Sequence, residues 1–180
     1  MQPEFTLIVV TTADGFIARD PGHSPAGWAS AEEQALFFAE VEAADWGIMG
    51  RHTHQAADRP DRRRIVFSSA LARPEWRRPT QLWLDPSGLN PDDLAALVAE
   101  VRPLRRGLIL GGTRVHDWFH AAGRISRVML TVEPVEFGAG LPLFTGQPGP
   151  AEEVLARLGY RLESERALNA SGTRLLMFAA

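Results

Sequence analysis

The sequence contains neither cysteine nor lysine among its 180 residues. Without cysteine the chain cannot form a disulfide, a thiolate nucleophile, an iron–sulfur cluster or a cysteine zinc site. Without lysine it cannot form a Schiff base or the lysine-bearing phosphate loop of nucleoside triphosphatases. All 19 basic residues are therefore arginines, a bias that base composition of the genome also explains. These absences exclude several enzyme classes, whereas the abundance of arginine says little about function.

Long apolar runs and a large net charge are absent as well. No apolar run approaches the roughly 20 residues of a membrane span, and the N-terminal stretch "MQPEFTLIVV" lacks the basic flank and cleavage site of a signal peptide. The net charge of -3 gives no field that would attract nucleic acid or an anionic membrane to the whole surface. The arginine cluster at 59–64 lacks the interleaved aromatic residues of a nucleic-acid patch. We expect a cytoplasmic protein that binds neither nucleic acid nor membrane.

Short apolar runs alternate with stretches long enough to form helices. Such runs are typical of strands covered on both faces, and they lie at 5–10, 46–49, 64–68, 81–85, 107–110, 127–132 and 174–179. Ser30 and Glu33 have capping-box spacing, which predicts a helix beginning at about residue 31. Asn90 predicts the start of a second helix, with Pro91 in its first position. We expect one α/β domain over residues 1–180, with a mostly parallel sheet finished by antiparallel strands from 127 onward.

The stretch "LILGGTRVHDWF", residues 108–119, places two glycines between a strand and a helix. Gly111 and Gly112 leave the end of the strand without side chains, and Thr113 is expected to cap the helix. The amides of the first helical turn then point outward, at the positive end of the helix dipole. This turn predicts a site for a phosphate-sized anion, although two glycines in such a turn also serve tight backbone geometry alone.

A second stretch, "IMGRHT" at 48–53, repeats the arrangement. A strand again ends in a glycine, Gly50, and the next turn opens with residues that can donate hydrogen bonds, Arg51, His52 and Thr53. Two anion sites at strand ends fit a dinucleotide.

These stretches resemble the dihydrofolate reductase superfamily. "MGRHT" followed by Arg-Pro and "IVFSS", and the "GG" ahead of "VHDWF", match its two cofactor loops in order. "TADGFIA" at 12–18 and "VEPVEFGAGLPLF" at 132–144 are more similar to the reductase domain of the riboflavin-biosynthesis deaminase-reductases. The resemblance covers nearly the whole chain. It implies the three-layer α/β fold of dihydrofolate reductase, a homodimer, and an NADPH-dependent reductase of a 5-amino-6-(phosphoribosylamino)uracil-like pyrimidine.

The resemblance also implies roles for particular residues. Arginine and hydroxyl donors suit the additional phosphate of NADPH, which NADH lacks. The residues implied to hold the pyrophosphate and the adenosine phosphate are Gly50, Arg51, His52 and Thr53. Ser68 and Ser69 are implied to flank the 2′-phosphate. The residues implied to complete the pyrophosphate cradle are Gly111, Gly112, Thr113 and Arg114.

Two carboxylates are candidates for the proton that hydride transfer can require. Dihydrofolate reductases carry an acid on the first helix, and a count back from Gly50 without gaps places Gln34 there, with Glu33 one residue away. As a capping-box residue, Glu33 is expected to have a structural role. Asp14 is the other candidate, although it also suits the Asp-Gly turn that it forms with Gly15.

Three alternatives were weighed against this interpretation. His116 and His120 have the spacing of a two-histidine zinc site, but no third ligand is evident and we predict no metal. Reduction of dihydrofolate or another pteridine is the nearest alternative activity. A non-catalytic NADP-binding protein is the alternative of another class, and it is motivated by the carboxylate missing from position 34. Turnover of NADPH with any heterocycle separates the last alternative from the two reductases.

Overall fold

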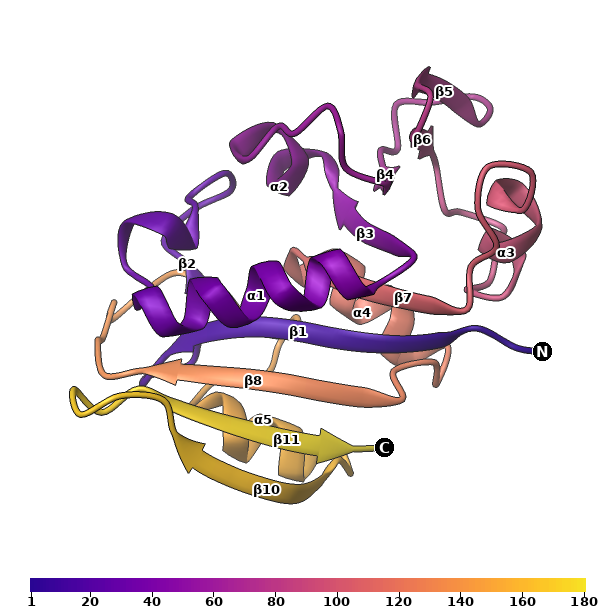
Figure 1. Cartoon of the computed structure of the whole chain (residues 1–180). Helices are drawn as coiled ribbons and strands as arrows, with labels where there is room; N and C mark the ends of the chain where they lie inside the picture. Colours follow the sequence, from indigo (N-terminus) through magenta and orange to yellow (C-terminus); the bar gives the residue numbers. More distant parts are fainter.

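The computed structural model describes all residues 1–180 and contains a nine-stranded sheet with helices on both faces (Figure 1). In spatial order the strands of this sheet are β10 (Arg161–Ala167), β11 (Arg174–Ala179), β8 (Arg127–Glu133), β1 (Glu4–Thr12), β7 (Arg106–Gly111), β3 (Trp46–Gly50), β4 (Arg64–Phe67), β6 (Gln81–Leu84) and β5 (Glu75–Arg78). A separate two-stranded sheet joins β2 (Phe16–Ala18) to β9 (Leu141–Pro142). The seven apolar runs of the sequence all form strands of the large sheet, as predicted.

The centre of the large sheet is parallel and its two edges are antiparallel. β1 pairs in parallel with β7 and β8, β3 pairs in parallel with β7 and β4, and β4 does so with β6. β10 and β11 close one edge in antiparallel fashion, and β5 closes the other. The expectation that every strand from 127 onward is antiparallel is wrong for β8, because the helix between β7 and β8 carries the chain across one face and back in the same direction.

Alternate residues of the central strands face two different helical layers. Leu7 of β1 belongs to the larger core, which also contains residues from α3 (Asp93–Val98), α4 (Thr113–Ala121) and α5 (Ala151–Arg157). Ile8 belongs to a smaller core on the other face, against Phe37 of α1 (Ala31–Ala43). Figure 1 shows α1 on one face of the sheet and α4 and α5 on the other. These are the three layers that the resemblance implies.

The predicted helix starts agree with the structure to within two residues. α1 begins at Ala31, directly after Ser30, whose hydroxyl accepts a hydrogen bond from the Glu33 amide at 3.2 Å. Asn90 opens the turn that leads into α3, although the helix itself begins at Asp93. Two further short helices are present, α2 (Arg51–Ala56) and a 3₁₀ turn at Pro25–Gly27. None of the helices has the length and apolar character that a membrane span needs.

Candidate active site

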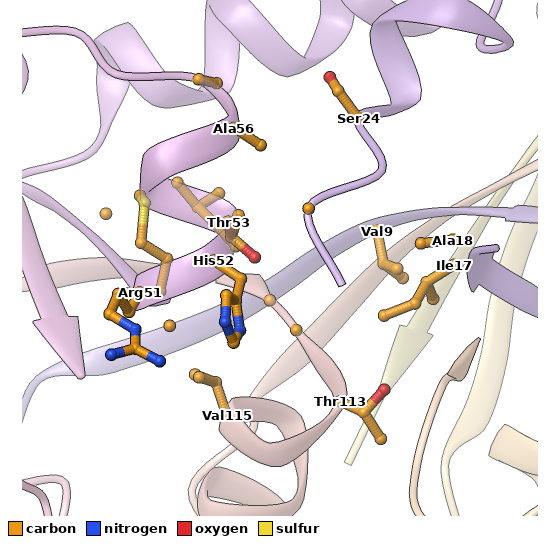
Figure 2. Close-up of a pocket in the computed structure, with 18 of the residues that line it drawn as sticks. Val9, Ile17, Ala18, Ser24, Arg51, His52, Thr53, Ala56, Thr113 and Val115 are labelled. Atoms are coloured by element: carbon orange, nitrogen blue, oxygen red, sulfur yellow. The ribbon is translucent and has the colours of Figure 1, made fainter. Parts of the chain in front are cut away.

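A cavity of about 1120 Å³ opens where β3, β4 and β7 end. Because these strands are parallel, their carboxyl ends meet at the same edge of the sheet. The residues predicted to bind cofactor therefore come together although they are far apart in the sequence, and each lines this cavity: Gly50, Arg51, His52, Thr53, Ser68, Ser69, Gly111, Gly112, Thr113 and Arg114. Figure 2 shows Arg51, His52 and Thr53 of α2 on one side of the cavity and Val9, Ile17 and Ala18 on the other.

The turn between β7 and α4 differs from its expected form in one respect. Gly112, and not Thr113, occupies the cap position, and no side chain caps the helix. Thr113 is the first helical residue, and its hydroxyl donates a hydrogen bond to the Pro142 carbonyl at 2.6 Å. A Cβ on Gly112 would meet only the Ile17 Cδ1 atom, at 4.0 Å. The turn therefore presents bare backbone to the cavity, as an anion site requires.

Six arginines but only four carboxylates line the cavity, and half of these arginines have no partner in the protein. Arg62 pairs with Glu42, Arg63 donates to two backbone carbonyls, and Arg64 donates to the Ala57 carbonyl at 2.8 Å. The side chains without a hydrogen bond or an ion pair are those of Arg51, Arg59 and Arg114. Guanidinium groups left free beside a cavity suit phosphate oxygens, which they bind through paired N–H groups.

These features fit a phosphorylated dinucleotide. The cavity volume, about 1120 Å³, slightly exceeds the roughly 300–1,000 Å³ of ordinary small-ligand sites. The bare turn at Gly112 leaves room for a phosphate against the backbone, and Arg51 and Arg114 supply cations from two different helices. Ser68 and Ser69, directly after β4, add hydroxyl groups at the same edge. Such a set of donors suits several phosphate groups.

Asp14 does not line the cavity, and its carboxylate is held by other parts of the chain. Its carboxylate accepts hydrogen bonds from the Thr12 hydroxyl at 2.6 Å and from the Gly138 amide at 2.7 Å. Burial acts to raise the pKa of Asp14, but these hydrogen bonds and one from the Phe137 amide outweigh it and lower the pKa. Asp14 joins the turn after β1 to the loop after β8, and its selection as a catalytic candidate stays a prediction.

Glu33 has the opposite environment, and only half of its expected capping box forms, in which the Glu33 amide donates to the Ser30 hydroxyl at 3.2 Å. A complete capping box would direct its carboxylate to the Ser30 amide. That amide instead donates to Glu133 Oε1, at 2.7 Å. The Glu33 carboxyl makes no hydrogen bond, although the side chain is buried and lines the cavity. Burial, reinforced by the nearby charge of Glu133, raises the pKa of Glu33 to about 7. Glu33 is therefore an uncommitted acid that can hold a proton at neutral pH.

Gln34 lines this corner of the cavity, and Glu133 lies behind it without lining the cavity. Gln34 lines the cavity, but its side-chain amide donates to the Ala29 carbonyl at 3.1 Å. Glu133, at the end of β8, accepts hydrogen bonds from Ser30 and from the Thr173 hydroxyl at 2.7 Å. Glu133 was not among the residues predicted from the sequence. The signal available was an acid directly after a buried apolar run, a position where a strand delivers its last side chain to the sheet edge.

The two histidines of the rejected zinc site face different partners. His116 Nδ1 lies 2.8 Å from the Leu143 carbonyl oxygen, and His120 Nδ1 lies 2.8 Å from the Tyr160 hydroxyl. Only His116 lines the cavity. The sequence analysis did not place His116 in the candidate site.

Comparison with known families decides the affiliation of the chain. The model of the RibD C-terminal domain matches residues 3–169. The chain belongs to the RibD C-terminal domain family. No curated protein matches the sequence.

Solved structures of similar fold include RibD proteins and a dihydrofolate reductase. A deaminase/5-amino-6-(5-phosphoribosylamino)uracil reductase from Thermotoga maritima is 15% identical with a TM-score of 0.73, over 99% of this chain and 56% of that one. A pyrimidine reductase-like protein from Corynebacterium diphtheriae is 14% identical with a TM-score of 0.70, over 98% and 91%. Dihydrofolate reductase from Enterococcus faecalis, complexed with NADP(H), is 14% identical with a TM-score of 0.66, over 99% and 97%. At these identities the likeness shows the fold, which is that of dihydrofolate reductase.

The raised pKa of Glu33 in this RibD-family chain predicts a pH-dependent stability. The folded protein holds the Glu33 proton up to about pH 7, whereas the unfolded chain releases it near the ordinary pKa of 4.5. Its stabilising contribution is thus fully present below the unfolded pKa and is lost as the pH rises through about 7. Glu33→Gln removes this loss, so at pH 8 the variant is expected to be more stable than the wild type by roughly 3 kcal/mol.

Urea unfolding at pH 4.5 and pH 8 measures the difference. Glu32→Gln is the matched control, because Glu32 is the exposed neighbour on the same helix. The control should behave like the wild type at both pH values. Equal stabilities of the wild type and Glu33→Gln at pH 8 would show that Glu33 is ionised without penalty in the folded chain.

Proposed function

We propose that this chain is an NADPH-dependent reductase of the riboflavin-biosynthesis type, acting on a 5-amino-6-(phosphoribosylamino)uracil-like pyrimidine. The observation that carries the proposal is one cavity that combines unpartnered arginines with a buried, uncommitted acid. Membership of the RibD C-terminal domain family supports it. The T. maritima protein of similar fold bears the name of this same reductase activity.

The chain's own residues divide between binding and proton handling. Arg51, Arg59 and Arg114 bind phosphate groups of cofactor and substrate, and the bare turn at Gly112 lets a phosphate approach the backbone. NADPH, when bound, would supply the hydride that forms a new C–H bond at the ribosyl carbon C1′. The C1′–O4′ bond of the sugar ring breaks, and O4′ takes up one proton to become the hydroxyl of the ribityl product. The apolar side chains that line the same cavity exclude water from the reacting atoms. Those of Phe37, Val41 and Leu110 are examples.

We assign the donation of this proton to Glu33. Its protonated form is substantial at neutral pH, because burial and Glu133 raise the pKa to about 7. A general acid is most effective when its pKa lies near the operating pH. We do not assign this role to Glu133, because it does not line the cavity and its two oxygens accept hydrogen bonds from Ser30 and Thr173.

Reduction of dihydrofolate or another pteridine is the second candidate. One observation favours it, because an acid on the first helix faces the cavity after all, at Glu33 instead of position 34. The same observation removes the motive for a non-catalytic NADP-binding protein. The homodimer implied by the family resemblance stays a prediction.

Absorbance of the nicotinamide band tests the proposal. The protein is mixed with NADPH and either 5-amino-6-(5-phosphoribosylamino)uracil or dihydrofolate. Oxidation with the aminopyrimidine is expected. Oxidation with dihydrofolate alone would establish the second candidate, and binding of NADPH without any oxidation would contradict both.

NADPH is expected to bind at least about tenfold more tightly than NADH. A charge-assisted hydrogen bond contributes about 1.5–3 kcal/mol, and only NADPH carries the 2′-phosphate that Arg51, Ser68 and Ser69 would contact. Calorimetry of both cofactors measures the ratio. Arg51→Ala should reduce this preference, whereas Arg105→Ala, at an exposed arginine outside the cavity, should leave it unchanged. Equal dissociation constants for the two cofactors in the wild type would refute the assignment of the 2′-phosphate.

A further inference from the structure

His116 carries a buried nitrogen that the protein does not use. The side chain lies in the first turns of α4 and is 1% exposed. Its Nδ1 atom contacts the Leu143 carbonyl at 2.8 Å, and a carbonyl can only accept, so Nδ1 carries the hydrogen. Burial lowers the pKa of His116 to about 4, which keeps the imidazole neutral. Nε2 is therefore an acceptor with a lone pair, and it has no hydrogen-bond partner in the protein.

This acceptor faces the turn that precedes α4. A Cβ on Gly111 would lie 3.5 Å from His116 Nε2 and 4.0 Å from Thr53 Oγ1. His116, Gly111 and Thr53 all line the large cavity. A buried acceptor left without a donor costs about 1–3 kcal/mol, and such groups in native proteins usually have a partner. A donor supplied by a ligand in the cavity accounts for this one.

We propose that His116 is a positioning residue whose Nε2 accepts a hydrogen bond from an N–H or O–H group of a ligand lying against the Gly111–Gly112 turn. The inference rests on the proposed function, which offers two sources of such a donor. One is the carboxamide of the nicotinamide, and the other is a sugar hydroxyl of the substrate. A phosphate oxygen does not fit, because two acceptors face each other unfavourably. His116 thus assigns a neutral donor group to the Gly111 side of this turn, whereas the phosphate lies against the backbone at Gly112 and beside the unpaired arginines.

Two substitutions separate this role from a purely structural one. In His116→Asn the short amide can still donate to the Leu143 carbonyl, but nothing reaches the position of Nε2. In His116→Gln the longer amide can reach that position. Loss of one hydrogen bond to the ligand is expected to weaken its binding about fivefold in His116→Asn. His116→Gln should restore affinity to within about twofold of the wild type.

Calorimetry with NADP⁺ and, separately, with 5-amino-6-(5-phosphoribosylamino)uracil gives the result. Weaker NADP⁺ binding in His116→Asn, restored in His116→Gln, assigns the donor to the cofactor. The same pattern with the aminopyrimidine alone assigns it to the substrate. Adenosine 2′,5′-bisphosphate lacks the nicotinamide, and its affinity should not change in either variant. His120→Asn is the matched control, because His120 lies on the same helix but does not line the cavity.

Several outcomes would overturn the role of His116. Unchanged affinities for both ligands would do so, and so would equal losses in both variants accompanied by a lower thermal midpoint. The ¹⁵N chemical shift of His116 Nε2 can be measured in the wild type, without any substitution. It must change when the ligand binds. A wild-type protein that binds neither NADP⁺ nor the aminopyrimidine would contradict the proposed function itself. If the wild type binds these ligands normally and the variants do so equally well, only the role of His116 is contradicted.

Discussion

Gly112→Val is expected to raise the dissociation constant of NADPH by more than about 100-fold, because the valine side chain would displace a phosphate that makes at least two charge-assisted hydrogen bonds of about 1.5–3 kcal/mol each. The thermal midpoint of the ligand-free protein should change little. Gly112 has a φ of -87°, which other residues adopt, and a Cβ there would meet only Ile17 Cδ1 at 4.0 Å. Calorimetry and thermal unfolding of the same sample measure both quantities.

Valine substitutions at two other glycines provide a control and a contrast for Gly112→Val. Gly27→Val is the matched control, because Gly27 is exposed, has open space around it and lies outside the cavity. Gly111→Val is the contrasting variant. Gly111 has a φ of +103°, so a valine there strains the backbone and should lower the thermal midpoint as well. The sequence alone predicts the same outcome for both cradle glycines, and the structure corrects this for Gly111. Retention of NADPH binding by Gly112→Val would place the phosphate elsewhere.

Glu33→Gln is expected to lower kcat about 100-fold, because positioned general acids contribute roughly 10²–10⁴-fold to rate. Cofactor affinity should stay within about twofold, since Glu33 is not assigned to phosphate binding. In the wild type, kcat should fall as the pH rises through about 7, where Glu33 loses its proton. The glutamine variant should lack this fall of kcat with pH. If Glu33 had only a structural role, the substitution would leave the pH dependence of kcat unchanged.

The exposed neighbour Glu32 provides the control for this experiment as well. Glu32→Gln should retain both the rate and the pH profile of the wild type. If Glu33→Gln keeps the full kcat and an unchanged pH profile, the proton donor is another group or water, and the assignment of Glu33 is wrong.

Much of the fold is predictable from the sequence because each buried strand has its own continuous apolar run. The seven continuous apolar runs correspond to β1, β3, β4, β6, β7, β8 and β11. β10 was missed because its residues, "RLESERA", are all exposed at the edge of the sheet and show no apolar pattern. β5 is an exposed edge strand of the same kind. Edge strands are stabilised by their single neighbour, which a local pattern does not contain.

In the candidate site, too, the local motifs were predictable from the sequence, whereas the contacts between distant residues were not. The glycine turns and their donors were identified because each is a short local motif, and the parallel sheet brings them to one edge. Glu33 was a candidate for the proton, but its free carboxyl was not predictable, because the Ser30 amide that should hold it donates to Glu133, which follows 103 residues later in the chain. His116 was discounted because its spacing to His120 was considered only as a metal site. Its unpartnered Nε2 depends on Leu143, which belongs to another loop.

The central claim is that this cavity transfers a hydride from NADPH to the sugar carbon of an aminopyrimidine. The most direct test is the mass of the product formed from 5-amino-6-(5-phosphoribosylamino)uracil and NADPH that carries deuterium at both C4 positions of the nicotinamide. We predict a reduced product about one mass unit heavier than the product formed with ordinary NADPH, because one deuterium replaces one hydrogen. Recovery of the aminopyrimidine unchanged, or of a reduced product without deuterium, would contradict it.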